Sequence, residues 1–149
     1  MEIERKFKVK QLPDLSRFPV HLLEQGYLCT DPVVRIRRED ESYYLTYKGK
    51  GLLVREEYNL PLTQEAYQHL LSKADGRIIR KKRYLIPFEE KTIELDIFDT
   101  PFNGLQIAEV EFTSEEEALS FLPPDWFGEE VTYDKRYHNS NLSRGISPL

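Results

Sequence analysis

The sequence predicts an α+β domain built around a large antiparallel sheet that is able to curl closed. Three observations support this fold class. Eight short segments alternate apolar and polar residues, as half-buried strands do, and turn signals separate them. Two segments with helical spacing lie between some of these strands. The chain also holds nine Tyr and eight Phe, which favour strands.

The predicted strands are the eight alternating segments. They span Glu2–Val9, Glu24–Thr30, Val33–Glu39, Tyr43–Lys48, Leu53–Pro61, Ile78–Pro87, Thr92–Phe98 and Ile107–Phe112. The loop Gly49-Lys50-Gly51 predicts a hairpin turn between two of them. This loop is not a P-loop, because it lacks the GxxxxGK[ST] spacing and the helix that follows it.

Capping residues mark the predicted helices. The first helix follows Thr63 and includes residues 65–71. The second follows Ser114, where Glu117 completes a capping box three residues on, and it ends near Pro123-Pro124. A third, shorter helix is expected after Thr132, through residues 134–137.

Composition sets limits on the class of protein. With 149 residues, 40% hydrophobic and 32% charged, the chain fits one globular domain. Its net charge of −5 gives no overall basic field of the kind that attracts nucleic acid. No apolar run approaches the roughly 18 residues that span a bilayer, and the charged N-terminus argues against a signal peptide. One cysteine, Cys29, fits a reducing compartment, so we expect a cytoplasmic protein.

Charged residues recur two apart in nearly every predicted strand, on the face opposite the apolar residues. Because side chains alternate along a strand, residues two apart point the same way. In the first strand Glu2, Glu4 and Lys6 share a face, and Arg5 is an exception on the other face. The remaining charged positions on this ionic face are Arg35, Arg37, Lys48, Arg55, Glu57, Lys81, Arg83, Glu94, Asp96, Glu109 and Glu111.

Two interpretations of this ionic face are open. An antiparallel sheet often has one face on the core and one in water. An ordinary wet face, however, mixes Thr, Ser and Gln with Lys, whereas this one is almost wholly ionic. If the sheet closes, the charges point into a lumen that must hold something able to neutralise both signs. Divalent cations would satisfy the carboxylates, and a polyphosphate would satisfy the arginines and lysines. The pattern therefore favours a site for a metal–polyphosphate complex.

The opening Glu2-x-Glu4-x-Lys6 resembles the ExExK signature of the CYTH superfamily, the triphosphate tunnel metalloenzymes. The resemblance covers nearly the whole chain, through Gln25-Gly26-Tyr27-Leu28, Arg35-x-Arg37, Lys48, Arg55-x-Glu57, Lys81-x-Arg83, Glu94-x-Asp96, Glu109-Val110-Glu111-Phe112 and residues 128–137. It implies a single domain over residues 1–149, with an eight-stranded antiparallel β-barrel that forms a tunnel. The chain is most similar to short bacterial inorganic triphosphatases, which implies hydrolysis of inorganic triphosphate to diphosphate and phosphate.

The resemblance also implies roles for the acidic residues. The metal ligands are expected to be Glu2, Glu4, Glu109 and Glu111. Four carboxylates without a cluster of His or Cys favour Mg²⁺ or Mn²⁺ over zinc. Glu57, Glu94 and Asp96 would complete the shell of a second metal or steady basic neighbours. For Glu94 and Asp96, a purely structural ion pair is an open alternative. Asn59 departs from the family pattern, which often has a further acid there.

Basic residues would hold the substrate. Arg35, Arg37, Lys48, Arg55, Lys81 and Arg83 are expected to contact phosphate oxygens, where the planar arginine fork suits bidentate bonds. Lys6 resembles a family lysine that works with a tyrosine, here Tyr27, and activation of water or of substrate is open. By itself Tyr27 fits a barrel packing residue better, and only the resemblance gives it a catalytic role. In this family a C-terminal helix can plug one tunnel mouth, so Lys135 or Arg136 would either contact substrate or lie on a solvated face.

Several alternatives remain at this point. A thiamine triphosphatase or a class IV adenylate cyclase of the same superfamily would use the same polyphosphate grip, and a non-catalytic polyphosphate-binding module is a third possibility. The basic run 77–83 is a weak sign of nucleic-acid binding. We expect a small-molecule triphosphate as the partner, with no nucleic acid and no membrane, and a homodimer is possible.

Overall fold

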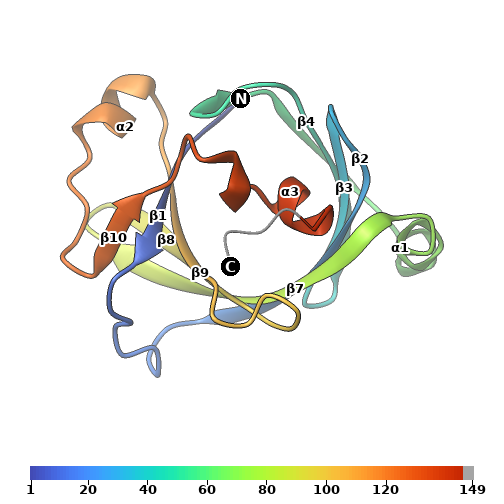
Figure 1. Ribbon diagram of the computed structural model, residues 1–149, viewed down its shortest axis with the longest axis horizontal. Coiled ribbons are helices and arrows are strands. Elements are labelled where there is room, and N and C mark those ends of the chain that lie inside the picture. The colour runs from blue at the N-terminus through green and yellow to red at the C-terminus, as the bar shows by residue number, and fades with distance from the viewer. Residues whose placement is uncertain (146–149) are drawn as a thin grey trace.

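The sheet of the computed structural model is antiparallel and curls into a barrel (Figure 1). The structure describes residues 1–145. Neighbouring strands follow the order β10-β1-β9-β8-β7-β2-β3-β4-β6, and β5 pairs with β1. The strands are β1 (Glu2–Val9), β2 (Val20–Thr30), β3 (Val33–Glu39), β4 (Ser42–Lys48), β5 (Val54–Arg55), β6 (Glu57–Pro61), β7 (Asp75–Phe88), β8 (Lys91–Phe98), β9 (Gln106–Glu111) and β10 (Phe127–Glu130).

The short strand β5 closes the barrel. Glu2 lies opposite Arg55 and Ile3 opposite Val54, which joins β1 to the chain that continues into β6 at the far edge of the sheet. Because only Glu56 separates β5 from β6, the two act as one broken strand, and the ring has eight positions. The predicted α+β fold with an antiparallel barrel is confirmed.

Within residues 1–145 the sheet has ten strands rather than the eight that were predicted. One additional strand arises because the predicted segment Leu53–Pro61 breaks at Glu56. The other is β10, which pairs with the C-terminal part of β1 and is too short to show alternation. Strands β2 and β7 also begin earlier than predicted, at Val20 and Asp75.

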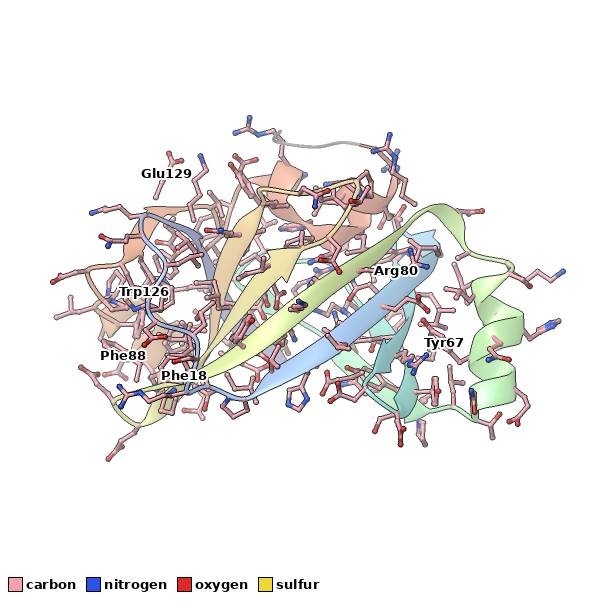
Figure 2. The ribbon with its side chains drawn as sticks, turned by 90° about the horizontal axis from the view of Figure 1, so that it is seen from below. Phe18, Tyr67, Arg80, Phe88, Trp126 and Glu129 are labelled. Carbon is pink, nitrogen blue, oxygen red and sulfur yellow. The ribbon has the colours of Figure 1, made fainter. Side chains whose placement is uncertain are left out.

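Helix α1 (Gln64–Leu71) covers the outside of β2, β3 and β4. As predicted, Thr63 caps it, with its hydroxyl accepting a hydrogen bond from the Ala66 N–H at 3.1 Å. Tyr67 projects from α1 toward the sheet (Figure 2) and is buried there. Gly26 on β2 permits the close approach of the segment after α1, because a Cβ at this position would lie 2.9 Å from the Cβ of Ala74.

Helix α2 (Glu115–Ser120) packs on the outside of β1 and ends before Pro123. Ser114 accepts the Glu117 N–H at 3.1 Å, while the Glu117 carboxylate accepts the Thr113 N–H. Arg5, the exception on the outer face of β1, donates to the Ala118 carbonyl at 2.7 Å and to both carboxylate oxygens of Glu130 at 2.8 Å. Arg5 therefore ties β1 to α2 and β10.

The apolar core beneath α2 lies outside the barrel. Its buried members are Phe7, Ile86, Ile93, Leu95, Ala108, Val110, Phe112, Ala118, Phe121 and Phe127. Phe18, Phe88 and Trp126 border this core at the end of the molecule away from α1 (Figure 2). No helix among residues 1–145 combines the length and the apolar character needed to cross a membrane.

The C-terminal segment enters the ring of strands. In place of the predicted helix over 134–137, the chain forms a 3₁₀-helix, η1 (Lys135–Tyr137), and then α3 (Asn139–Ser143), which Figure 1 shows inside the ring. A second apolar cluster surrounds α3, and it consists of Tyr27, Val33, Ile79, Phe98, Phe102, Leu105, Ile107, Val131, Tyr137 and Leu142. One end of the barrel interior is therefore filled by apolar packing, and the rest is left to charged side chains.

Candidate active site

A charged cavity of about 380 Å³ occupies the rest of the barrel interior. Its acidic lining consists of Glu2, Glu4, Glu57, Glu94, Glu109 and Glu111, and its basic lining consists of Lys6, Arg35, Arg37, Lys48 and Arg83. Tyr44, Asn59 and Asn139 complete the wall. The strand alternation that suggested an ionic inner face thus brings most of the predicted site residues together.

Strand register places the carboxylates beside one another. Glu4 of β1 lies opposite Glu111 of β9, and Glu109 lies between Lys6 of β1 and Glu94 of β8. Two groups of three carboxylates result, Glu2 with Glu57 and Glu111, and Glu4 with Glu94 and Glu109. Within each group, one oxygen from each residue lies within 4.8 Å of the others. The predicted ligands therefore divide into two sets, each completed by one residue that was predicted only as a supporting one.

Burial and like charges make several of these carboxylates costly to ionise. The pKa of Glu4 is well above its usual value, first because of burial and then because of the charges of Glu109 and Glu2. Burial also raises the pKa of Glu2 and of Glu94. A divalent cation between such groups would offset both the desolvation and the repulsion. Oxygen-only donor sets of this kind suit Mg²⁺ or Mn²⁺, so the residues fit the metal that the sequence predicted.

The pKa of Glu109 is shifted in the opposite direction to the pKa values of Glu2, Glu4 and Glu94. Burial raises its pKa, but the nearby charges of Lys6, Arg83 and Lys81 outweigh burial, and the pKa lies far below the usual range. Lys6 is the reciprocal case. Its Nζ lies 3.8 Å from Glu109 and 4.0 Å from Glu4, and although burial lowers the pKa of Lys6, Glu109 and Glu4 raise it above its usual value. Lys6 is therefore a partly buried ammonium between two of the predicted metal ligands.

Arg35 and Arg37 are the basic groups best placed for an anion. Among the described residues, neither lies within 4.0 Å of a carboxylate, although both are buried. Arg35 donates to Thr46 at 3.1 Å, but its Nε–H is buried without a hydrogen-bond partner in residues 1–145. A buried N–H of this kind is expensive to leave unpaired, and phosphate oxygens are suitable acceptors. Burial and then the charge of Arg37 lower the pKa of Arg35.

Lys48 and Arg83 are tied to carboxylates instead. Lys48 lies 3.1 Å from both oxygens of Glu2 and 3.5 Å from Glu57. Arg83 donates two hydrogen bonds to Asp96, at 2.7 and 2.8 Å, and a third to Glu94 at 3.2 Å. These ion pairs orient the carboxylates, and they leave fewer donors free for a ligand.

Comparison with known proteins identifies the family. Residues 1–143 match the CYTH domain. The chain belongs to this family. It is 42% identical over 149 residues to a protein of Nitrosomonas europaea named inorganic triphosphatase, a match that covers 97% of this chain and 98% of the relative. A protein of Acetivibrio thermocellus with the same name is 40% identical, over 95% of this chain and 92% of its own length.

A solved structure extends the comparison to three dimensions. A crystal structure of an inorganic triphosphatase superposes on the chain with a TM-score of 0.73 at 38% identity, covering 99% of this chain and 97% of the other. The family resemblance inferred from the ionic doublets is confirmed. The CYTH fold thus accounts for the barrel, while the residues of the cavity wall must be considered one by one.

Four predicted site residues do not line the cavity of this CYTH domain. Tyr27 is buried in the apolar end of the barrel, and its hydroxyl oxygen accepts a hydrogen bond from Gln25 at 3.1 Å. Arg55 lies opposite Glu2 on the neighbouring strand and donates to the Gly49 carbonyl at 3.1 Å. Lys81 and Asp96 form an ion pair behind the wall. Their predicted roles in binding or catalysis remain predictions.

Sequence reasoning left three residues of the wall and one residue behind it out of the predicted site. Tyr44 and Asn59 have the same strand parity as Lys48 and Glu57, so the alternation that selected the charged residues contained them as well. The buried Gln25 has the parity of Tyr27 and stands in the family motif, whereas Asn139 has no such signal. Lys135 and Arg136 do not line the cavity, and Arg136 instead pairs with Asp134 at 2.6 Å.

Proposed function

We propose that this chain catalyses the divalent-metal-dependent hydrolysis of inorganic triphosphate to diphosphate and phosphate. The observation that carries the proposal is the cavity, where two groups of three carboxylates face two arginines that have no carboxylate partner in residues 1–145. The first set fits metal ions and the second fits phosphate oxygens. Relatives named inorganic triphosphatase at 42% and 40% identity support the same activity.

The carboxylate groups are the proposed metal sites. Glu2, Glu57 and Glu111 would hold one Mg²⁺ or Mn²⁺, and Glu4, Glu94 and Glu109 would hold a second. Bound there, the ions would neutralise charge on the phosphate oxygens and lower the pKa of a coordinated water. Asn59 donates to Glu57 at 3.2 Å, so the position that often holds an acid in relatives here steadies a proposed ligand.

The remaining cavity residues would position the phosphates. Arg35 and Arg37 would grip oxygens of the triphosphate chain, Arg35 through its unpaired Nε–H. The oxygen of the attacking water would bond to the terminal phosphorus while the bridging P–O bond breaks and diphosphate leaves, and the proton that the water loses would pass to the departing diphosphate. Lys6, kept protonated by Glu109 and Glu4, would stabilise the charge that develops on the reacting oxygens. Tyr27 does not line the cavity, so any part it takes in the reaction would be indirect, through the side chains that it contacts.

The alternatives fit the cavity less well. A thiamine triphosphatase or an adenylate cyclase needs an apolar or aromatic site for the organic end of its substrate, and Tyr44 is the one aromatic side chain lining the cavity among the described residues. A pure polyphosphate-binding module does not need six carboxylates.

Nucleic-acid binding through residues 77–83 is also disfavoured, because Lys81 and Arg83 face inward as ion pairs. On the outside of β7, Arg80 (Figure 2) pairs with Glu24 at 2.9 Å.

Phosphate release from tripolyphosphate with Mg²⁺ or Mn²⁺ tests the proposal. We expect activity that EDTA abolishes and that Glu4→Gln reduces by at least a hundredfold, with the fold intact by circular dichroism. Glu129→Gln is the matched control, because Glu129 is an exposed carboxylate on β10 (Figure 2). Full activity in Glu4→Gln would refute the metal-ligand assignment, and formation of cyclic AMP from ATP would favour a cyclase.

Two further points concern the cellular location and the oligomeric state of the protein. The single cysteine, Cys29, supports a cytoplasmic location. The homodimer that the sequence left open is tested by sedimentation of the purified chain, which measures its mass in solution.

A further inference from the structure

Gln25 lies behind the cavity wall, between two of the predicted site residues. Its side chain is fully buried, with 0% exposed area. The carbonyl oxygen Oε1 accepts a hydrogen bond from Nε of Arg37 at 2.8 Å, and Nε2 donates to the hydroxyl oxygen of Tyr27 at 3.1 Å. Gln25 is thus the one side chain among the described residues that bonds both to a cavity arginine and to Tyr27.

Strand register explains this position. Gln25 on β2 lies directly opposite Arg37 on β3, and Tyr27 lies opposite Arg35. Because the four residues share the inner face, the amide of Gln25 reaches across to the guanidinium and along its own strand to the phenol. The contact therefore follows from the fold and does not depend on a flexible loop.

Chemistry determines the orientation of the amide. An arginine Nε–H only donates, so the oxygen of the Gln25 amide must face Arg37. This leaves the NH₂ group facing Tyr27, whose oxygen must then accept. The hydroxyl hydrogen of Tyr27 consequently points away from Gln25. One amide thus sets both the plane of the Arg37 guanidinium and the direction of the Tyr27 hydroxyl.

The hydrogen bond to Gln25 fixes the plane of the Arg37 guanidinium, and this matters because no carboxylate in residues 1–145 pairs with Arg37 to orient it. Its Nη1 makes only a long contact of 3.5 Å with the Tyr44 hydroxyl, so the 2.8 Å bond to Gln25 is its shortest hydrogen bond in residues 1–145. A guanidinium fixed at Nε presents its terminal N–H groups as a fork, and bidentate phosphate contacts require a fork in a defined plane.

We propose that Gln25 is a positioning residue for phosphate binding, and that it couples Tyr27 to Arg37. It fixes the Arg37 fork toward the cavity, and Tyr27 in turn holds the Gln25 amide. This inference rests on the proposed function, since it names the residue that orients one of the proposed phosphate ligands. Tyr27, although buried outside the cavity, would thus affect phosphate binding by holding the Gln25 amide.

Gln25→Met tests the proposal, because it keeps the length of the side chain and removes both hydrogen bonds. We expect KM for tripolyphosphate to rise about tenfold with kcat changed less than threefold, since one hydrogen bond to a charged group is lost. The Kd for tripolyphosphate in EDTA, measured by calorimetry, should weaken by a similar factor. Leu23→Met is the matched control, a buried residue on the same face of β2 that lies opposite Glu39 instead of Arg37.

A double-mutant cycle shows whether Gln25 acts through Arg37. In an Arg37→Lys background, Gln25→Met should change Kd by less than twofold, because the guanidinium that it orients is gone. Tyr27→Phe, which keeps the ring packing, should raise KM two- to threefold and should add nothing to Gln25→Met. Fully additive effects, or an unchanged Kd in Gln25→Met, would overturn the proposal.

The same measurements separate this proposal from the proposed function. A wild-type protein that binds tripolyphosphate but releases no phosphate with Mg²⁺ or Mn²⁺ would refute the activity. In that case the coupling of Gln25 and Arg37 in the Kd values would still support the positioning role. Conversely, an active enzyme without that coupling would refute the positioning role alone.

Discussion

The Nζ atom of Lys81 lies 2.7 Å from Oδ2 of Asp96, and both side chains have 0% exposed area. Arg83 also donates two hydrogen bonds to Asp96, so one buried carboxylate compensates two cations. Burial lowers the pKa of Lys81 to about 7, despite the attraction of Asp96, while Arg83 and Lys81 hold the pKa of Asp96 below its usual value against burial. Asp96 is therefore the main counter-charge for the two buried cations of β7, Lys81 and Arg83.

We predict that Asp96→Asn destabilises the fold strongly. The substitution leaves Lys81 and Arg83 buried without their main counter-charge, which typically costs about 3–5 kcal/mol. Urea unfolding followed by circular dichroism would measure the loss. Asp134→Asn is the control, since Asp134 pairs with the largely exposed Arg136 and should cost less than about 1 kcal/mol. Equal stability of the two variants would contradict the role given to Asp96.

Lys6→Ala should impair turnover more than substrate binding. Lys6 is a partly buried ammonium beside Glu4 and Glu109, where it would stabilise developing charge with little competition from water. We expect kcat to fall about a hundredfold, by analogy with the loss of one charge-stabilising donor, while KM changes less than fivefold. Lys8→Ala, on the same strand but with 46% of its side chain exposed, should retain wild-type kcat. An increase in KM at constant kcat would instead make Lys6 a binding residue.

Strand alternation predicted much of the site, because it depends only on the period of two. Glu2, Glu4 and Glu109 were placed on the inner face by that rule, and they line the cavity. The same rule does not show whether an inward-facing side chain reaches the cavity or is buried at the apolar end of the barrel. Lys81 therefore resembled a phosphate ligand in the sequence, although it lies behind the wall with Asp96.

Other differences come from backbone events that leave little trace in the sequence. Arg55 lies opposite Glu2 and shares its face, yet its guanidinium donates to the Gly49 carbonyl of the preceding loop and does not line the cavity. Contributions from the C-terminal segment, such as Asn139, depend on a chain that returns into the barrel more than 130 residues after β1 begins. Local patterns predict faces of strands, whereas returns of this kind depend on tertiary packing.

Stability should fall in mildly acidic solution because of His138. Burial first, and then the positive charge of Lys6, lower the pKa of His138 to about 4 from an ordinary value of 6.5. Above pH 6.5 the imidazole is neutral in both the folded and the unfolded chain, so it has no effect. As the pH falls from 6.5 toward 4, the unfolded chain binds a proton that the folded chain does not, and stability declines.

Two measurements check this prediction. The ring proton resonances of His138, assigned through His138→Gln, should titrate near pH 4 in the folded protein. Urea unfolding of wild type and His138→Gln should show that the wild type loses more stability between pH 6.5 and pH 4. Parallel losses in the two proteins, or a titration at an unshifted pH, would rule out this origin of acid sensitivity.

Asn139 offers a way to separate the stability of the C-terminal segment from its effect on substrate. Its Oδ1 accepts a hydrogen bond from Lys81 at 3.2 Å, and its side chain lines the cavity. We predict that Asn139→Asp keeps the stability of the fold, because a carboxylate still accepts from Lys81 and adds an opposite charge. The same charge faces the phosphates, so KM for tripolyphosphate should rise about five- to tenfold, a free-energy change of roughly 1 kcal/mol.

Ser140→Asp is the matched control for this prediction. It adds the same charge one residue further along α3, at a side chain that does not line the cavity, and it should leave KM within twofold. Asn139→Ala should behave in the opposite way to Asn139→Asp. It removes an acceptor from a buried ammonium, which costs about 1–3 kcal/mol of stability, but adds no charge to the cavity. If all three variants raise KM equally, the C-terminal segment affects the site through its packing alone, and Asn139 does not face the substrate.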